Sequence, residues 1–212
     1  MAATHDRPGD EPKPPRIRKS ERRKQLLRVG VEVFATVGYA PTTMEAIAER
    51  AEVTQALLTR YFDSKEAILL AILADIRTVS LDRWESELAA LGDPLARLHA
   101  VADLFLAMAA EFELAFQLML RLLVDRADDP PMGALRAFFL DMETLLSGII
   151  AEGQQSGVFR RSLDPRVGAW QLIQTAVGYK ITQPLVAPVY QEPDYLSRAV
   201  DCLLDCLIKT DV

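Results

Sequence analysis

The side chains between Thr43 and Lys65 are of the types that bind double-stranded DNA. The amide of Gln55 can form two hydrogen bonds with an adenine, and Leu57 can contact the methyl group of a thymine. Hydroxyl and cationic side chains suited to phosphate contacts surround them: Thr54, Thr59, Arg60, Tyr61 and Lys65. Lys65 also lies at a predicted helix start, where anions are favoured. The segment therefore carries both base-reading and phosphate-binding chemistry.

Two short helices separated by a tight turn must position these side chains. Apolar residues of the first helix recur at helical spacing and face a small core: Met44, Ile47, Ala48 and Ala51. Leu57 or Leu58, together with Phe62, is expected to bury the second helix. Residues suited to N-caps precede each predicted helix: Thr42 or Thr43, then Thr54, then Asp63 or Ser64. The pattern is typical of a helix-turn-helix that holds its second helix in the major groove.

Short motifs follow one another in a fixed order along this region: Gly38-Tyr39, Thr42-Thr43, Ile47-Ala48, Val53-Thr54, Tyr61-Phe62 and Ser64-Lys65-Glu66. In order and spacing these motifs resemble those of the TetR family of bacterial transcriptional regulators. The resemblance covers Ile17 to Leu73, and beyond it the chain is similar to the family only in size and helical layout. It implies a DNA-binding domain followed by a helical domain that binds a ligand and forms dimers.

The resemblance also assigns roles within the motif. Gln55, Ala56 and Leu57 match the positions from which family members reach base edges, and we add Thr43 to this DNA-binding set. The chain departs from the family at Glu52, where glycine is usual, which places a carboxylate near the expected phosphates. A two-fold symmetric dimer would set two recognition helices on successive major grooves, so the operator is expected to be an inverted repeat.

Composition and charge are consistent with a DNA-binding protein. The 212 residues are 50% hydrophobic, enough for a small and a medium domain. Residues 1–65 hold 12 Lys and Arg against 9 Asp and Glu, whereas residues 66–212 hold 12 against 21. The excess of basic residues in the N-terminal part suits contact with a phosphate backbone. No apolar run reaches the roughly 20 residues of a membrane span, so we expect a cytoplasmic protein with no membrane partner.

Helical periodicity without strand-like alternation predicts an all-α fold. Residues 1–15 are expected to be disordered, residues 16–63 to form the DNA-binding domain with its motif at 43–62, and residues 64–212 to form the ligand-binding and dimerisation domain. Seven helices are expected besides the two short helices of the motif: 20–37, 64–91, 94–110, 113–126, 132–155, 165–181 and 193–209. Prolines and glycines mark most of the breaks between them.

Large, pliable apolar side chains are concentrated in the middle helices. A packed core explains each of them singly, whereas a cavity for an apolar or amphipathic small molecule explains their abundance of Phe and Met. The resemblance favours the cavity. The predicted lining is Phe105, Met108, Phe112, Phe116, Met119, Phe139, Met142, Trp170, Gln174 and Val177, with Gln174 as the best polar candidate.

The last two helices are apolar around much of their circumference, which favours burial on two sides. The resemblance implies that they form a homodimer interface, and the residues assigned to it are Trp170, Ile173, Val177, Leu196, Val200, Leu203 and Leu207. Cys202 and Cys206 lie one turn apart on the final helix. They are expected to pack as buried side chains, with a redox role as the lesser alternative.

A helical carrier or enzyme that binds a hydrophobic molecule is the alternative interpretation. The chain has only two His residues, His5 and His99, and no phosphate-binding glycine loop or nucleophile elbow. No catalytic residue, metal site or cofactor is therefore assigned. The expected function is that of a dimeric transcriptional regulator, most simply a repressor that a hydrophobic effector releases from its DNA operator.

Overall fold

The computed structural model describes residues 18–124, 130–185, 188–192 and 194–207. The predicted tail at 1–15 and the ends of two predicted helices, at 125–126 and 208–209, lie outside these ranges. The regular elements within them are all helical, which confirms the all-α prediction. No helix in these ranges is long and apolar enough to cross a membrane.

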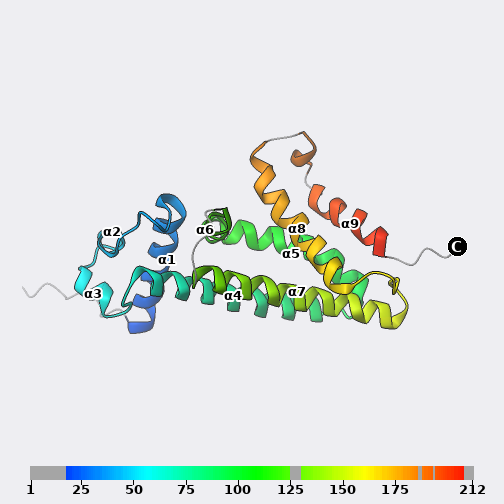
Figure 1. The fold of residues 1–212 in the computed structure, drawn as a ribbon, viewed down its shortest axis with the longest axis horizontal. Helices are drawn as coiled ribbons and strands as arrows, with labels where there is room; N and C mark the ends of the chain where they lie inside the picture. Colours follow the sequence, from blue (N-terminus) through cyan, green and yellow to red (C-terminus); the bar gives the residue numbers. More distant parts are fainter. Residues whose placement is uncertain (1–17, 125–129, 186–187, 193, 208–212) are drawn as a thin grey trace, which may run out of the picture.

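Three helices form the N-terminal end of the molecule (Figure 1): α1 (Lys19–Val37), α2 (Met44–Arg50) and α3 (Gln55–Thr59). Gly38 ends α1 with a φ of +100°. Glycine adopts a positive φ readily because it has no Cβ atom. The hydroxyls of Thr43, Thr54 and Ser64 cap α2, α3 and the following helix by accepting hydrogen bonds from backbone N–H groups at 3.1–3.2 Å. Each cap is one of the residues predicted for it.

The remaining helices form the larger end: α4 (Lys65–Ala89), α5 (Pro94–Glu111), α6 (Glu113–Val124), α7 (Pro131–Ser156), α8 (Pro165–Thr182) and α9 (Tyr195–Leu207). Two short 3₁₀ helices, Gln183–Leu185 and Pro188–Gln191, connect α8 to α9. The long helices α4 and α7 run side by side along the molecule, and α8 and α9 cover one side of the far end (Figure 1).

Two hydrophobic clusters hold the fold together. The first joins α1, α2, α3 and the start of α4 to Leu118 and Leu122 of α6 and Leu135 of α7. The second joins the end of α4, through Trp84 and Leu88, to α5, α7, α8 and α9. The predicted domain boundary before Ser64 is thus crossed by a continuous core, because helices of the larger end pack directly on α1.

Candidate DNA-binding surface and ligand cavity

The second helix of the motif, α3, is anchored by its apolar side and leaves its polar side in solvent. Leu58 is fully buried and Phe62 is 5% exposed. The guanidinium of Arg23 lies 5.3 Å from the centroid of the Phe62 ring, which links α1 to the end of the motif. Because α3 has only one and a half turns, this burial and the Thr54 cap determine how the helix is presented.

Most of the predicted DNA-binding side chains are available on that surface. Those exposed to solvent are Thr43, Thr54, Gln55, Ala56, Thr59 and Arg60, whereas Leu57 and Tyr61 are half-buried. The hydroxyl of Thr59 donates to the carbonyl of Gln55 at 2.9 Å, while Gln55 and Arg60 have side chains free of any described hydrogen bond. The geometry therefore presents an amide and a guanidinium on one short helix.

Lys65 differs from its predicted role as a phosphate contact. Its Nζ donates to the carbonyls of Tyr39, Ala40 and Thr42 at 3.0, 2.8 and 2.8 Å, and it lies 4.7 Å from the centroid of the Tyr39 ring. These bonds use all three donors of the ammonium group. We therefore reassign Lys65 as a positioning residue that ties the start of α4 to the turn between α1 and α2.

The turn of the motif is built around Glu52, whose φ is +54°. The N–H of Val53 donates to the carbonyl of Ala48 and the N–H of Glu52 donates to that of Glu49, both at 3.0 Å. This pair of bonds is a Schellman motif, which requires a left-handed residue after the helix. Glu52 accordingly stands where glycine is usual in the resembling family, and its side chain makes the left-handed conformation costly.

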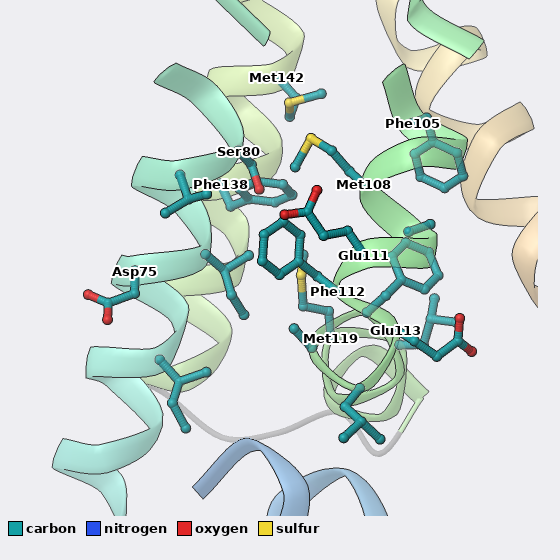
Figure 2. Close-up of a pocket in the computed structure, with 18 of the residues that line it drawn as sticks. Asp75, Ser80, Phe105, Met108, Glu111, Phe112, Glu113, Met119, Phe138 and Met142 are labelled. Carbon is teal, nitrogen blue, oxygen red and sulfur yellow. The ribbon is translucent and has the colours of Figure 1, made fainter. Parts of the chain in front are cut away.

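A cavity of about 700 Å³ lies between α4, α5, α6, α7 and α8, with α1 across one end (Figure 2). Its lining is mainly apolar, and its volume is in the range of small-molecule sites. Phe105 and Phe116 meet edge to face with centroids 5.5 Å apart. In the described chain, no three His, Cys, Asp or Glu side chains gather into a group that could hold a metal ion.

Much of the predicted lining is brought together in this cavity: Phe105, Met108, Phe112, Phe116, Met119, Phe139, Met142 and Val177. Trp170 and Gln174 were placed there wrongly. Gln174 is exposed, and both residues line a separate shallow depression on the outer side of α8. The error arises because α8 is apolar on more than one side, so helical spacing alone does not show which side faces the cavity.

The sequence prediction missed the contribution of α4. Its lining residues include Ile72, Ile76, Val79, Ser80 and Trp84. The first three recur at helical spacing in the sequence, but none of the five was assigned to a site. Figure 2 shows the Ser80 hydroxyl on the wall that α4 contributes to the cavity. No described hydrogen bond uses this hydroxyl, so it can serve a ligand. Trp84, rather than Trp170, is the tryptophan that contacts the cavity.

Trp170 has a structural role instead. Its indole N–H donates to the carboxylate of Glu143 at 2.7 Å, and Arg166 donates to the other oxygen of that carboxylate. These two hydrogen bonds, followed by the charge of Arg166, hold the pKa of Glu143 below its ordinary value. The side chain of Glu143 is buried while ionised, and this network ties α7 to the start of α8.

Arg121 connects the cavity wall to the DNA-binding end. It lies on α6, two residues beyond the lining residue Met119, and its Nη1 donates to the carbonyls of Ala35 and Thr36 at 3.0 and 3.1 Å. These carbonyls are at the C-terminus of α1, where the helix dipole favours a cation. A shift of α6 would therefore be transmitted to the end of α1.

Within the described part of the single chain, the residues assigned to a dimer interface are all buried or half-buried. Leu196 and Val200 are 1% and 2% exposed within the single chain, so they cannot form an interface while this fold is kept. They pack with Leu204 in the second cluster, as Ile173 does, and Leu203, Val177 and Trp170 are half-buried against it. The side chain of Leu207 lies outside the described part. Cys202 is exposed, contrary to the expected packing.

Glu52→Gly is expected to raise the stability of the protein by roughly 0.5–1 kcal/mol, because glycine adopts a left-handed backbone without the Cβ clash. Thermal unfolding should show this as a rise of about 1–4 °C. Glu52→Gln removes the charge but keeps the strained Cβ, so its melting temperature should stay near that of the native chain. Equal stabilisation by both variants would attribute the effect to charge and contradict the strain argument.

Lys65→Met is expected to lower stability by roughly 1–3 kcal/mol, because the carbonyls of Tyr39, Ala40 and Thr42 lose a charged donor. The loss should appear as a lower midpoint in urea unfolding. Lys19→Met, at the exposed start of α1, provides the control for removing a lysine charge and should leave the midpoint within about 0.5 kcal/mol of the native value. A Lys65→Met midpoint equal to that control would contradict the positioning role and favour the phosphate contact predicted from the sequence.

Comparison with known proteins agrees with this architecture. The family model described as "Bacterial regulatory proteins, tetR family" matches residues 26–72, from the middle of α1 into α4. The transcriptional regulator RutR of Escherichia coli K12 is 30% identical over 141 residues, which cover 64% of this chain and 65% of RutR. The chain thus matches slightly less than two thirds of that relative's length.

Solved structures extend the likeness to the whole fold. A structure from Saccharomonospora viridis in complex with choline superposes with a TM-score of 0.78 at 22% identity, covering 91% of this chain and 100% of that one. The regulator FadR of Bacillus subtilis in complex with stearoyl-CoA gives 0.71 at 23% identity, covering 88% and 97%. The motif match and the sequence relative together support a TetR-family regulator, and the solved structures show that the chain has the same fold.

Proposed function

We propose that this protein is a dimeric, sequence-specific DNA-binding transcriptional regulator, a repressor that leaves an inverted-repeat operator when an apolar or amphipathic molecule fills its cavity. The observation that carries the proposal is the continuity between the two sites. Helix α4 begins at the recognition motif, and its residues Ile72 to Trp84 line the cavity. A ligand that alters the packing around α4 therefore acts on the element that carries α3.

The exposed face of α3 supports the DNA-binding part of the proposal. Gln55 is suited to reading a base, while Arg60 and the hydroxyls of Thr43 and Thr54 are suited to phosphates. The cavity supports the ligand part, since its apolar lining fits a hydrophobic molecule. Choline and stearoyl-CoA, which accompany the two structural relatives, are both small molecules bound by proteins of this fold.

The outer face of α8 supports dimerisation. Val167, Gln171, Gln174, Gly178 and Ile181 follow one another at helical spacing on that face. Val167 and Ile181 are 50% and 54% exposed, and a Cβ added at Gly178 would meet nothing within 4 Å. A face with exposed apolar side chains at its two ends and a glycine near one of them allows close approach by the same face of a second copy. Gln174 thus belongs to this proposed interface rather than to the cavity.

DNA binding and dimerisation can be tested together with operators selected from random DNA. The selected sites should be inverted repeats that bind two chains. Gln55→Ala should relax preference at one base pair of each half-site, whereas Arg60→Ala should weaken all sequences about equally and reduce the salt slope by about one. Val167→Glu combined with Ile181→Glu should yield monomers in sedimentation and lose operator binding, because each half-site alone offers few contacts.

Val124→Glu is the matched control for the interface variant. Val124 is 75% exposed at the end of α6, so this change should preserve both the dimer and operator binding. A native chain that selects no sequence would refute the proposed function. An undisturbed dimer in the double variant would show instead that another face forms the interface.

Ligand-induced release is tested with 1-dodecanol, an uncharged probe with a long apolar chain. In a Trp170→Phe background, binding should change the emission of Trp84 and lower operator affinity, and operator DNA should weaken dodecanol binding by the same factor. Ala176→Phe places a ring in the cavity and should weaken dodecanol binding at least about tenfold. Ala74→Phe, an exposed change on α4, should not. Dodecanol binding without any effect on operator affinity would contradict the repressor mechanism.

A further inference from the structure

The cavity has a buried apolar end and an exposed charged end. Trp84, Val101, Leu146 and Leu172 line the buried end and are at most 4% exposed. The rim consists of exposed residues from α1, α4 and the junction of α5 with α6: Lys24, Arg28, Asp75, Val79, Glu111, Phe112, Glu113 and Leu114. A bound amphiphile would keep its apolar chain at the buried end and its polar group at the rim, where water remains.

The α1 side of the rim is cationic. Lys24, Leu27, Arg28 and Val31 are three and four residues apart, so one face of α1 closes this end of the cavity. Within the described chain, neither Lys24 nor Arg28 makes a hydrogen bond or ion pair. Two cations four residues apart on a helix repel each other, and an anion bound between them would relieve that repulsion.

Four carboxylates line the cavity, and three of them are already paired with a cation. Glu32 pairs with Arg50 at 3.0 Å, Glu111 with Arg83 at 2.6 Å and Glu113 with Lys180 at 3.6 Å. Asp75 has no such partner in the described chain, but Figure 2 shows its carboxylate directed away from Phe112 and Met119. The charges left to meet a ligand head group are therefore mainly those of Lys24 and Arg28.

We propose that the cavity binds a single-chain acyl amphiphile with an anionic head group, and that Lys24 and Arg28 of α1 bind that head group. The inference rests on the proposed ligand-sensing function and defines its ligand class. Both a free carboxylate and the phosphates of an acyl thioester would meet this requirement, since lysine and arginine bind either anion through charge-assisted hydrogen bonds.

With this assignment the ligand contacts the DNA-binding end directly, through α1. The acyl chain of the ligand contacts α4, α5, α6 and α7. Its head group binds α1, which packs on the recognition motif. A bound amphiphile therefore bridges the two ends of the molecule and fixes the position of α1 relative to α6. Release from DNA follows when this bridged arrangement differs from the one that fits the operator.

The test compares head groups on one chain length, using Trp84 emission in the Trp170→Phe protein. Dodecanoate and dodecanoyl-CoA should each bind at least about tenfold more tightly than 1-dodecanol, and dodecyltrimethylammonium should bind more weakly than dodecanol. Decanoate, dodecanoate and tetradecanoate should differ by about fourfold per methylene until the cavity is filled. A preference between the carboxylate and the thioester would identify which anion the rim accommodates.

Matched variants assign the effect to α1. Lys24→Gln combined with Arg28→Gln should reduce dodecanoate affinity about tenfold and leave dodecanol affinity unchanged, which a folding defect would not do. Lys19→Gln, an exposed lysine of α1 outside the cavity, should change neither. Lys24→Glu combined with Arg28→Glu should reverse the preference toward dodecyltrimethylammonium.

Three outcomes would overturn the head-group assignment. They are equal affinities for dodecanoate and dodecanol in the native chain, a preference for the ammonium probe, and a carboxylate preference that survives the double Gln variant. In each of these cases dodecanol could still bind and release the operator, and the proposed function would stand. If no probe of any charge binds, the ligand-sensing function itself fails.

Discussion

The structure depends on one helix, α4, being shared by two hydrophobic clusters. Ile68, Leu69, Ile72 and Leu73 pack in the N-terminal cluster, and Trp84 and Leu88 pack in the C-terminal one. Between them the helix meets the cavity through Ile76, Val79 and Ser80. A packed core resists gradual deformation, so the less densely filled interval is where the two ends can change their relative position.

Two cations tie the connection between α1 and α2 to helices that line the cavity. Lys65 on α4 binds the carbonyls of Tyr39, Ala40 and Thr42, and Arg121 on α6 binds those of Ala35 and Thr36. The segment from Ala35 to Thr42, which joins α1 to α2, is thus held from two helices that both line the cavity. Its backbone carbonyls have charged donors on either side of Gly38, which makes this connection stiffer than an ordinary surface turn.

The sequence predicted the local structure well because its signals are local. Caps at Thr43, Thr54 and Ser64 and the burial of Leu58 and Phe62 follow from residue type and short spacing. The rotation of α8 and α9 is set by tertiary packing instead, so Gln174 was placed in the cavity and Leu196 on the surface. Lys65 was misassigned for a related reason, since its acceptors are more than twenty residues away in the sequence.

The strained turn at Glu52 makes the recognition motif depend on the helices around it. A residue with a Cβ in the left-handed region destabilises the end of α2, while the bonds of Val53 and Glu52 to Ala48 and Glu49 keep the turn closed. The motif is therefore held in shape by its surroundings, namely Lys65, Arg121 and the packing of α1 on α4 and α6, more than by its own helices. A domain that relies on its neighbours in this way is sensitive to the position of α4 and α6, and under the proposed function a ligand needs only to favour one of their arrangements to alter DNA binding.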